Sequence, residues 1–156
     1  MRNKFTKVTA AIVCIALAVG VGCEQSPYVL APVRGTVTID GQPLSRAKVM
    51  FAPVEVANNP NPGKPAFGIL KDDGSFVLTT CEKDDGAVVG EHWLTIIKLG
   101  GKSGGATLVS NLPKSAPQFS RLTMPQRVSV LSGQENQVHL KLTAQDVARY
   151  GVEVRD

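Results

Sequence analysis

The stretch Val33-Arg-Gly-Thr-Val-Thr-Ile-Asp-Gly41 alternates small or apolar residues with polar ones and then ends in Asp-Gly. A period of two is typical of a β-strand that buries one face and exposes the other. An Asp-Gly pair directly after such a strand predicts a tight turn with positive φ angles. This stretch therefore indicates a half-buried strand and a turn, a pattern that the rest of the chain repeats.

Further short segments of the same kind follow along the chain. In residues 46–51 the apolar residues Ala47, Val49 and Phe51 recur at every second position, which predicts another strand. The remaining predicted strands cover residues 66–70, 75–80, 91–99, 127–131 and 137–142, and the last two of these are expected to form a closing hairpin. The segments expected to be loops or irregular connections are residues 56–65, 81–89, 100–105 and 108–125.

About seven short strands separated by turn signals, with no long amphipathic helix before residue 143, predict an all-β fold. The chain has 156 residues, enough for one ordinary domain, and its 15 glycines and 10 prolines suit a turn-rich protein. We therefore expect a seven-stranded or so antiparallel Greek-key sandwich over residues 33–142. In the C-terminal extension, residues 143–156, we expect a helix over 143–150 capped by Thr143 and an edge strand over 152–154.

The first 22 residues have the pattern of an export signal rather than of a folded element. Basic residues at positions 2, 4 and 7 are followed by a nearly unbroken apolar run over residues 8–21, and small residues then precede Cys23. The apolar run is too short for a comfortable transmembrane helix. This order resembles a bacterial lipoprotein signal peptide, although Gly20 stands where that family usually has leucine.

The resemblance implies that residues 1–22 are removed and that Cys23 becomes the lipid-modified N-terminus of an exported protein. Lipid on Cys23 would attach the chain to a membrane and hold it in the cell envelope, at the outer membrane or the periplasmic face. Residues 23–32, which include two prolines, are then expected to be a semi-extended tether. An ordinary secretory signal cleaved nearby and an uncleaved anchor are the alternatives.

The charge balance changes when the signal segment is set aside. The full chain has 17 Lys and Arg against 13 Asp and Glu, a formal net charge of +4. Three of the basic residues lie in residues 1–22, which leaves 14 against 13 and a net charge of +1. The remaining charges form no basic run, so we expect no nucleic-acid partner.

The cysteines do not build a disulfide framework. Of the three, Cys14 lies in the signal segment and Cys23 is the expected lipidation site, so Cys81 has no partner within the mature chain. Acidic neighbours around Cys81 disfavour a thiolate. We therefore interpret Cys81 as an inert thiol rather than a nucleophile.

Segments 35–44, 47–53, 73–80 and 85–96 together resemble the carboxypeptidase-regulatory-like domains of bacteria, and the similarity spans residues 33–142. That family consists of transthyretin-like β-sandwiches, often carried by small lipoproteins. The resemblance implies a non-catalytic accessory or adhesion-like module without a cofactor. His92 departs from the aromatic residue common in the family. The transthyretin-like fold also occurs in a purine-pathway hydrolase, whose C-terminal Tyr-Arg-Gly-Ser signature is missing here.

Carboxylates cluster in two turns, at Asp72 and Asp73 and again at Asp84 and Asp85. If both turns lay at one end of the sandwich, their oxygens would suit Ca²⁺. The spacing matches no calcium loop, however, and tight turns favour Asp-Gly pairs in any case. We therefore expect turn residues and no metal site, with these four aspartates as the only candidates for metal ligands.

The remaining chemical motifs are interpreted as structural. His92 has the parity of the core residues in its strand and is expected to be part-buried, whereas His139 is expected to face solvent. Two histidines without a usable cysteine are too few for a zinc site. The Gly-Lys-Ser within residues 100–104 lacks the spacing and the following helix of a phosphate-binding loop, so we expect a hairpin tip there.

Trp93 is the most informative single residue for function. If the next residue along the strand faces the core, Trp93, Thr95 and Ile97 share the outer face. An exposed stripe of this kind is a candidate surface for binding a ligand or a partner. The alternative, which we favour, is that the irregular chain of residues 108–125 covers the stripe.

These observations lead to three hypotheses. The first is a lipid-anchored, non-enzymatic cell-envelope protein that presents the β-sandwich as a binding or structural module. The second is a carbohydrate- or protein-binding module that acts through the Trp93 face, with a glycan or an envelope protein as partner. The third, a small hydrolase, has the least support because no nucleophile and base can be paired in the sequence.

Overall fold

The structure is a computed structural model that describes residues 28–55, 61–99 and 119–152. Within those ranges the chain forms eleven strands and one helix, and seven of the strands have three or more residues. These seven are β2 (Val33–Ile39), β4 (Ala47–Pro53), β5 (Ala66–Ile69), β6 (Ser75–Val77), β8 (Gly90–Lys98), β9 (Arg121–Val130) and β10 (Asn136–Leu142). The shorter strands are β1 (Leu30–Ala31), β3 (Gln42–Pro43), β7 (Ala87–Val88) and β11 (Gly151–Val152), and helix α1 is Ala144–Tyr150.

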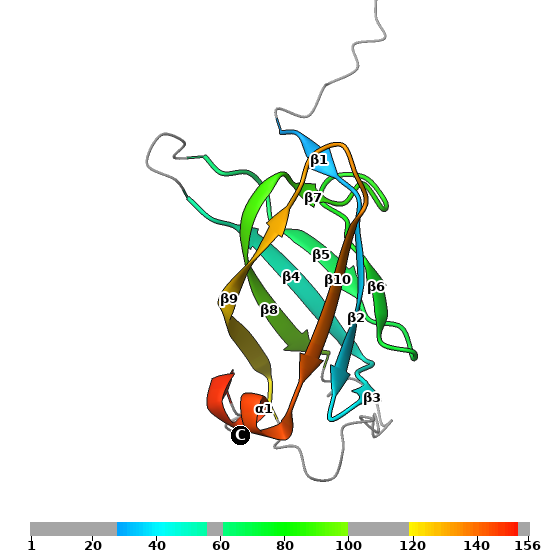
Figure 1. Ribbon diagram of the computed structural model, residues 1–156, viewed down its shortest axis with the longest axis vertical. Helices are drawn as coiled ribbons and strands as arrows, with labels where there is room; N and C mark the ends of the chain where they lie inside the picture. The colour runs from blue at the N-terminus through cyan, green and yellow to red at the C-terminus, as the bar shows by residue number, and fades with distance from the viewer. Residues whose placement is uncertain (1–27, 56–60, 100–118, 153–156) are drawn as a thin grey trace, which may run out of the picture.

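The strands form two main sheets that pack against each other, so the predicted all-β sandwich is confirmed (Figure 1). One sheet has five antiparallel strands in the order β11-β9-β8-β4-β5. The other has β2 at its centre, with β10 on one side and β3 and β6 on the other. β10 runs parallel to β2, while the other pairs of this sheet are antiparallel. No helix in the described part of the chain is long and apolar enough to cross a membrane.

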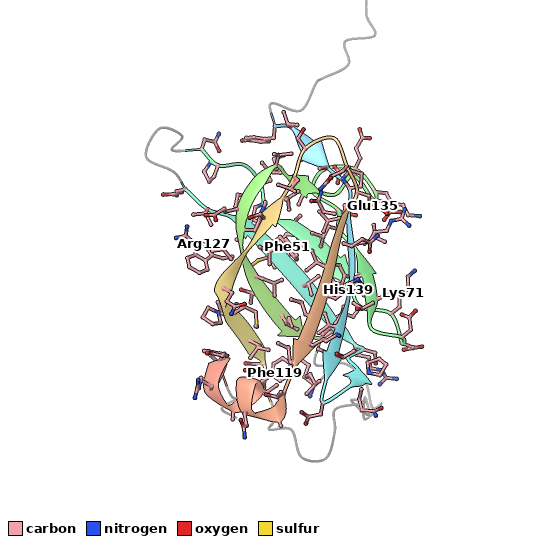
Figure 2. All side chains as sticks on the ribbon, in the orientation of Figure 1. Phe51, Lys71, Phe119, Arg127, Glu135 and His139 are labelled. Carbon is pink, nitrogen blue, oxygen red and sulfur yellow. The ribbon has the colours of Figure 1, made fainter. Side chains whose placement is uncertain are left out.

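The core lies between the two sheets and is built from the alternating residues that the sequence predicts. Val33, Val37 and Ile39 of β2 are fully buried, and so is Phe51 of β4, which stands in the interior of the molecule (Figure 2). The polar residues between them on β2 point outward. Burial of one face of each sheet against the other accounts for the period of two along these strands.

Gly35 and the Asp40-Gly41 turn explain why the opening stretch of sequence is so specific. A side chain at position 35 would collide with the Val138 carbonyl of β10 and with the Phe76 ring, so glycine is needed where these strands meet. The turn has positive φ at both residues, 49° at Asp40 and 78° at Gly41, as predicted. It joins β2 to β3.

The predicted hairpin of residues 127–131 and 137–142 is wrong. β9 begins at Arg121, within the segment expected to be irregular, and it pairs with β8 in the five-stranded sheet. β10 crosses to the other sheet and pairs in parallel with β2. Because the two strands belong to different sheets that face each other, Leu122 and Val130 of β9 and Leu142 of β10 are buried in one common core.

Asn136 lies where the chain passes from β9 in one sheet to β10 in the other, at a position where the sequence suggests only a turn residue. Its side chain is 7% exposed. The Nδ2 group donates to the carbonyls of Pro32, Leu131 and Gln134, and Oδ1 accepts from the Leu131 N–H at 2.8 Å. The amide therefore saturates the backbone groups that the crossing would otherwise leave unpaired.

The folded unit also extends beyond residues 33–142 on the N-terminal side. Leu30 and Ala31, which the sequence assigns to the tether, form β1 and pair with β7. β7 itself lies within residues 81–89, which were expected to be a connection. The sandwich therefore begins before Val33, and the expected signal segment lies outside the described residues.

The C-terminal extension is part of the fold. Thr143 caps α1 as predicted, because its hydroxyl accepts from the Asp146 N–H and Asp146 accepts from the Thr143 N–H. Val147 is the buried residue on the inner side of the helix, and β11, which follows the helix, pairs with β9. The expected edge strand over 152–154 is seen only as far as Val152, because residues 153 and 154 lie outside the described residues.

Candidate functional site

The outer face of the five-stranded sheet carries three large apolar side chains that are open to solvent. Trp93 is 39% exposed, Phe67 is 40% exposed and Ile69 is 68% exposed. The strand registers place the outward residues in three rows: Ala52, Trp93 and Arg127; Phe67, Met50, Thr95 and Thr123; and Ile69, Lys48, Ile97 and Arg121. We call this surface the Trp93 face.

Trp93 is held in place by a cation and its counter-ion. The Cζ atom of Arg127 lies 4.9 Å from the centre of the indole ring. One guanidinium nitrogen of Arg127, Nη1, donates to a carboxylate oxygen of Glu91 at 2.8 Å. A cation over an indole at an exposed site stabilises by about 0.5–1 kcal/mol. One side of the ring is therefore already occupied, and Trp93 as a whole remains 39% exposed.

The three residues predicted to share the outer face differ in their exposure. Thr95 is 5% exposed, with its hydroxyl 3.4 Å from that of Thr123 on β9. Ile97 is half-buried. The favoured interpretation placed residues 108–125 over this face. Residues 121–125 instead belong to β9 and pair beside β8, and residues 108–118 lie outside the described residues.

The outer face of the other sheet is polar. Along β2 it carries Arg34, Thr36 and Thr38, and along β10 it carries Gln137, His139 and Lys141. Arg34 pairs with Glu135 at 2.8 Å, and Thr36 is hydrogen-bonded to His139 at 3.0 Å. The two faces of the sandwich therefore differ in chemistry: aromatic and aliphatic side chains are open to solvent on the Trp93 face, and solvated polar groups cover this one.

The four candidate aspartates lie in turns at opposite ends of β6. Asp72 and Asp73 precede the strand, and Asp84 and Asp85 follow it. Hydrogen bonds from the Ser75 side chain and backbone lower the pKa of Asp73. Among the described residues no group of three or more His, Cys, Asp or Glu side chains is placed to hold a metal ion.

Asp85 organises the turn between β6 and β7. Its two oxygens accept from the backbone N–H groups of Thr80, Cys81 and Glu82 at 2.6–2.8 Å. Partial burial works to raise the pKa of Asp85, but the hydrogen bonds from these amides prevail and lower it. The carboxylate therefore does the work of a turn residue, holding the amides of residues 80–82.

The two histidines and Cys81 lie on three different elements: His92 on β8, His139 on β10 and Cys81 in the turn before β7. His92 is 1% exposed in the core, more deeply buried than the part-buried position predicted, and His139 is exposed as predicted. Cys81 is exposed and unbridged. Cys23 lies outside the described residues, so the expected lipidation site stays a prediction.

Comparisons with family models, with curated proteins and with solved structures find no match for this chain. What the protein does is therefore inferred from its own residues. The sequence singled out Trp93 but missed Arg127, Glu91 and Phe67. Glu91 has the same parity as Trp93 on one strand, so the sequence could have indicated it. Phe67 and Arg127 reach this face only through strand pairing.

Proposed function

We propose that this chain is a lipid-anchored, non-enzymatic protein of the cell envelope, and that its sandwich docks a partner through the Trp93 face. The observation that carries the proposal is the half-exposed indole of Trp93, fixed by Arg127 beside further exposed apolar residues. Tryptophan and arginine are the residues most enriched at the energetic centres of protein interfaces. The other outer face has no comparable anchor among its described residues.

The arrangement favours a protein over a glycan as the partner. A sugar ring binds an indole by stacking on its flat side, and Arg127 already covers one side of Trp93. The indole edge and the apolar residues in neighbouring rows remain free to pack against an irregular protein surface. A glycan acting on the open side of the ring is the second candidate.

Site-specific crosslinking in the producing cell tests the docking surface. A photo-crosslinking residue at position 93 is expected to give a discrete adduct with an envelope protein. The matched control is the same residue at position 141, an exposed lysine on the polar face of the other sheet. Equal adducts from both positions, or none from position 93, would count against the proposal.

A parallel stability measurement separates docking from folding. Trp93→Ala is expected to lower the free energy of unfolding by less than about 2 kcal/mol, because the side chain is half-exposed and loses mainly its contact with Arg127. A much larger loss would mean that Trp93 serves the core instead.

The anchor is tested by mass spectrometry of the mature protein. We expect an N-terminus at Cys23 carrying diacylglycerol, and a soluble, unmodified product from Cys23→Ser. An intact Met1 in the wild-type protein would overturn the lipoprotein part of the proposal without affecting the docking face.

A further inference from the structure

The folded part of the chain begins close to Cys23, the expected site of the lipid. The Tyr28 hydroxyl donates to Oδ1 of Asn61 at 3.1 Å, and the Val29 carbonyl accepts from the Val89 N–H at 2.9 Å. Five residue steps lead from Cys23 to Tyr28, and they span at most about 18 Å when fully extended. The tether is therefore shorter than the sequence predicts, because its second half is part of the sandwich.

Two large apolar side chains are open to solvent at this end of the sandwich. Val29 is 65% exposed and Leu131 is 54% exposed. A short run of backbone contacts joins them, since the Val29 carbonyl accepts from Val89 and the next residue, Gly90, pairs with Val130. Figure 1 shows β1 and the connection from β9 to β10 at the same end, opposite α1. We call this the β1 end.

The charged groups around the β1 end do not make it cationic. Two ion pairs, Arg34 with Glu135 and Arg127 with Glu91, are each closed at 2.8 Å. Among the other described residues near this end, carboxylates outnumber ammonium groups: Glu55, Lys64, Glu82, Lys83, Asp84 and Asp85. Anionic headgroups are therefore not attracted by charge, and the apolar side chains are what this end offers to a membrane.

We infer that the β1 end rests on the bilayer that holds the lipid anchor, with Val29 and Leu131 among the headgroups. The inference rests on the lipid proposed at Cys23, which fixes a bilayer within about 18 Å of Tyr28. A short tether makes the contact intramolecular, with an effective concentration on the order of millimolar. Two exposed apolar side chains therefore suffice for a contact that a free protein would not hold.

This contact sets the sandwich upright on the membrane. β10 runs from Asn136 at the β1 end to Leu142 beside α1, which is about 20 Å of strand, so α1 points away from the bilayer. Trp93 lies three residues along β8 from Gly90, about 10 Å from the β1 end, and it faces sideways. The partner proposed for the Trp93 face would thus be met beside the protein, close to the membrane surface.

Lipid-borne quenchers measure this orientation. The acylated chain is purified from the producing cell, checked by mass spectrometry and reconstituted in phosphatidylcholine vesicles that carry a headgroup nitroxide. In a Cys81→Ser background, single cysteines at positions 29, 131 and 145 carry a fluorophore, and position 145 is exposed on α1. We expect quenching at positions 29 and 131 to exceed that at position 145 by about threefold or more, because about 20 Å of strand separates the two ends.

A matched pair of substitutions locates the contact. In the chain labelled at position 29, Leu131→Glu is expected to lower the quenching about twofold or more, because a carboxylate opposes entry among the headgroups. Leu99→Glu makes the same change at an exposed leucine beyond the other end of β8 and should leave the quenching unchanged. Circular dichroism of each variant checks the fold. The reciprocal pair, a label at position 131 with Val29→Glu, carries the test if the first does not fold.

The possible failures are distinguishable. Equal quenching at positions 131 and 145, quenching that survives Leu131→Glu, or quenching that requires phosphatidylglycerol would overturn the inference and leave the anchor intact. Quenching of Trp93, the only tryptophan, by a nitroxide on the acyl chains would place the Trp93 face in the bilayer and overturn the inference together with partner docking. An N-terminus without acyl chains in the mass spectrum would overturn the anchor and the inference that rests on it.

Discussion

We expect the wild-type protein to lose stability as the pH falls from 6.5 to about 5, and we expect replacement of His92 with leucine to remove this pH dependence. The imidazole is 1% exposed, and its ring centre lies 5.9 Å from that of Phe51. Its Nδ1 atom is 3.1 Å from the Gly90 carbonyl, which can only accept, so Nδ1 carries the hydrogen. Nε2 is buried and has no hydrogen-bond partner among the residues that the structure describes.

The direction of the pH effect comes from the burial of this ring. Burial lowers the pKa of His92 below its ordinary value of 6.5, against a smaller opposite effect of the Gly90 carbonyl. Below pH 6.5 the unfolded chain therefore binds a proton that the folded chain resists. The stability that neutral His92 contributes is fully present above pH 6.5 and is lost as the pH falls.

The magnitude is bounded by one proton. A single group changes the free energy of unfolding by at most about 1.4 kcal/mol per pH unit, so the wild-type protein should lose up to about 2 kcal/mol between pH 6.5 and about pH 5. Asp73, Asp85 and Asp146 have a lowered pKa as well, but their effect begins only as the pH falls toward 3.8. The chosen window therefore isolates histidine.

Urea unfolding at about pH 7.5, 6.5, 5.5 and 5 measures the effect. His92→Leu should give a free energy of unfolding that is flat across the window. At about pH 7.5 this variant should be more stable by about 1 kcal/mol, because it removes an orphaned buried acceptor at the cost of one hydrogen bond. His139→Gln, which replaces the other histidine, should keep the wild-type slope. A slope that persists in His92→Leu, or that disappears in His139→Gln, would refute the reasoning.

Four further substitutions test the fold by urea unfolding. Asn136→Ala should lower the free energy of unfolding by about 3 kcal/mol, because it leaves the buried backbone groups of Leu131, Pro32 and Gln134 without hydrogen bonds. A loss below about 1 kcal/mol would contradict that role. Gly35→Ala should lower the free energy of unfolding by more than about 3 kcal/mol, because the new side chain collides with β10 and Phe76. Gly41→Ala should lower it by only about 1 kcal/mol, because position 41 has open space but a positive φ. Equal losses would contradict the close approach at Gly35. Asp85→Ala should lower the free energy of unfolding by about 2 kcal/mol, because three backbone amides lose their acceptor. Because the pKa of Asp85 is lowered in the folded protein, the variant should also lose less stability than the wild-type protein as the pH falls below 3.8. An unchanged acid transition would contradict this.

Strands β2, β4 and β8 were open to prediction because each one carries its own pattern. Alternation along β2, β4 and β8 is a local property, and it follows from the burial of one face of each strand. The Asp40-Gly41 turn and the Thr143 cap were predictable for a similar reason, since each depends on side chains within a few residues of one another.

The candidate site was only partly predictable. Parity alone places Trp93 on an outer face, but its exposure depends on what lies beside and above it. Arg127 reaches the indole because β9 pairs with β8 across a register shift, and no sequence pattern specifies that shift.

The sequence by itself therefore determined the class of the fold and the faces of strands such as β2, β4 and β8, because these depend on neighbours along the chain. It missed β1, β7 and the first half of β9. Tertiary structure alone decided which strands share a sheet. The short connection between β9 and β10 predicted a hairpin. Instead, the buried Asn136 amide hydrogen-bonds the backbone where the chain passes from one sheet to the other, and β9 and β10 bury their apolar residues from opposite sheets. That choice depends on packing partners about a hundred residues away, as at the Asn136 contact with Pro32.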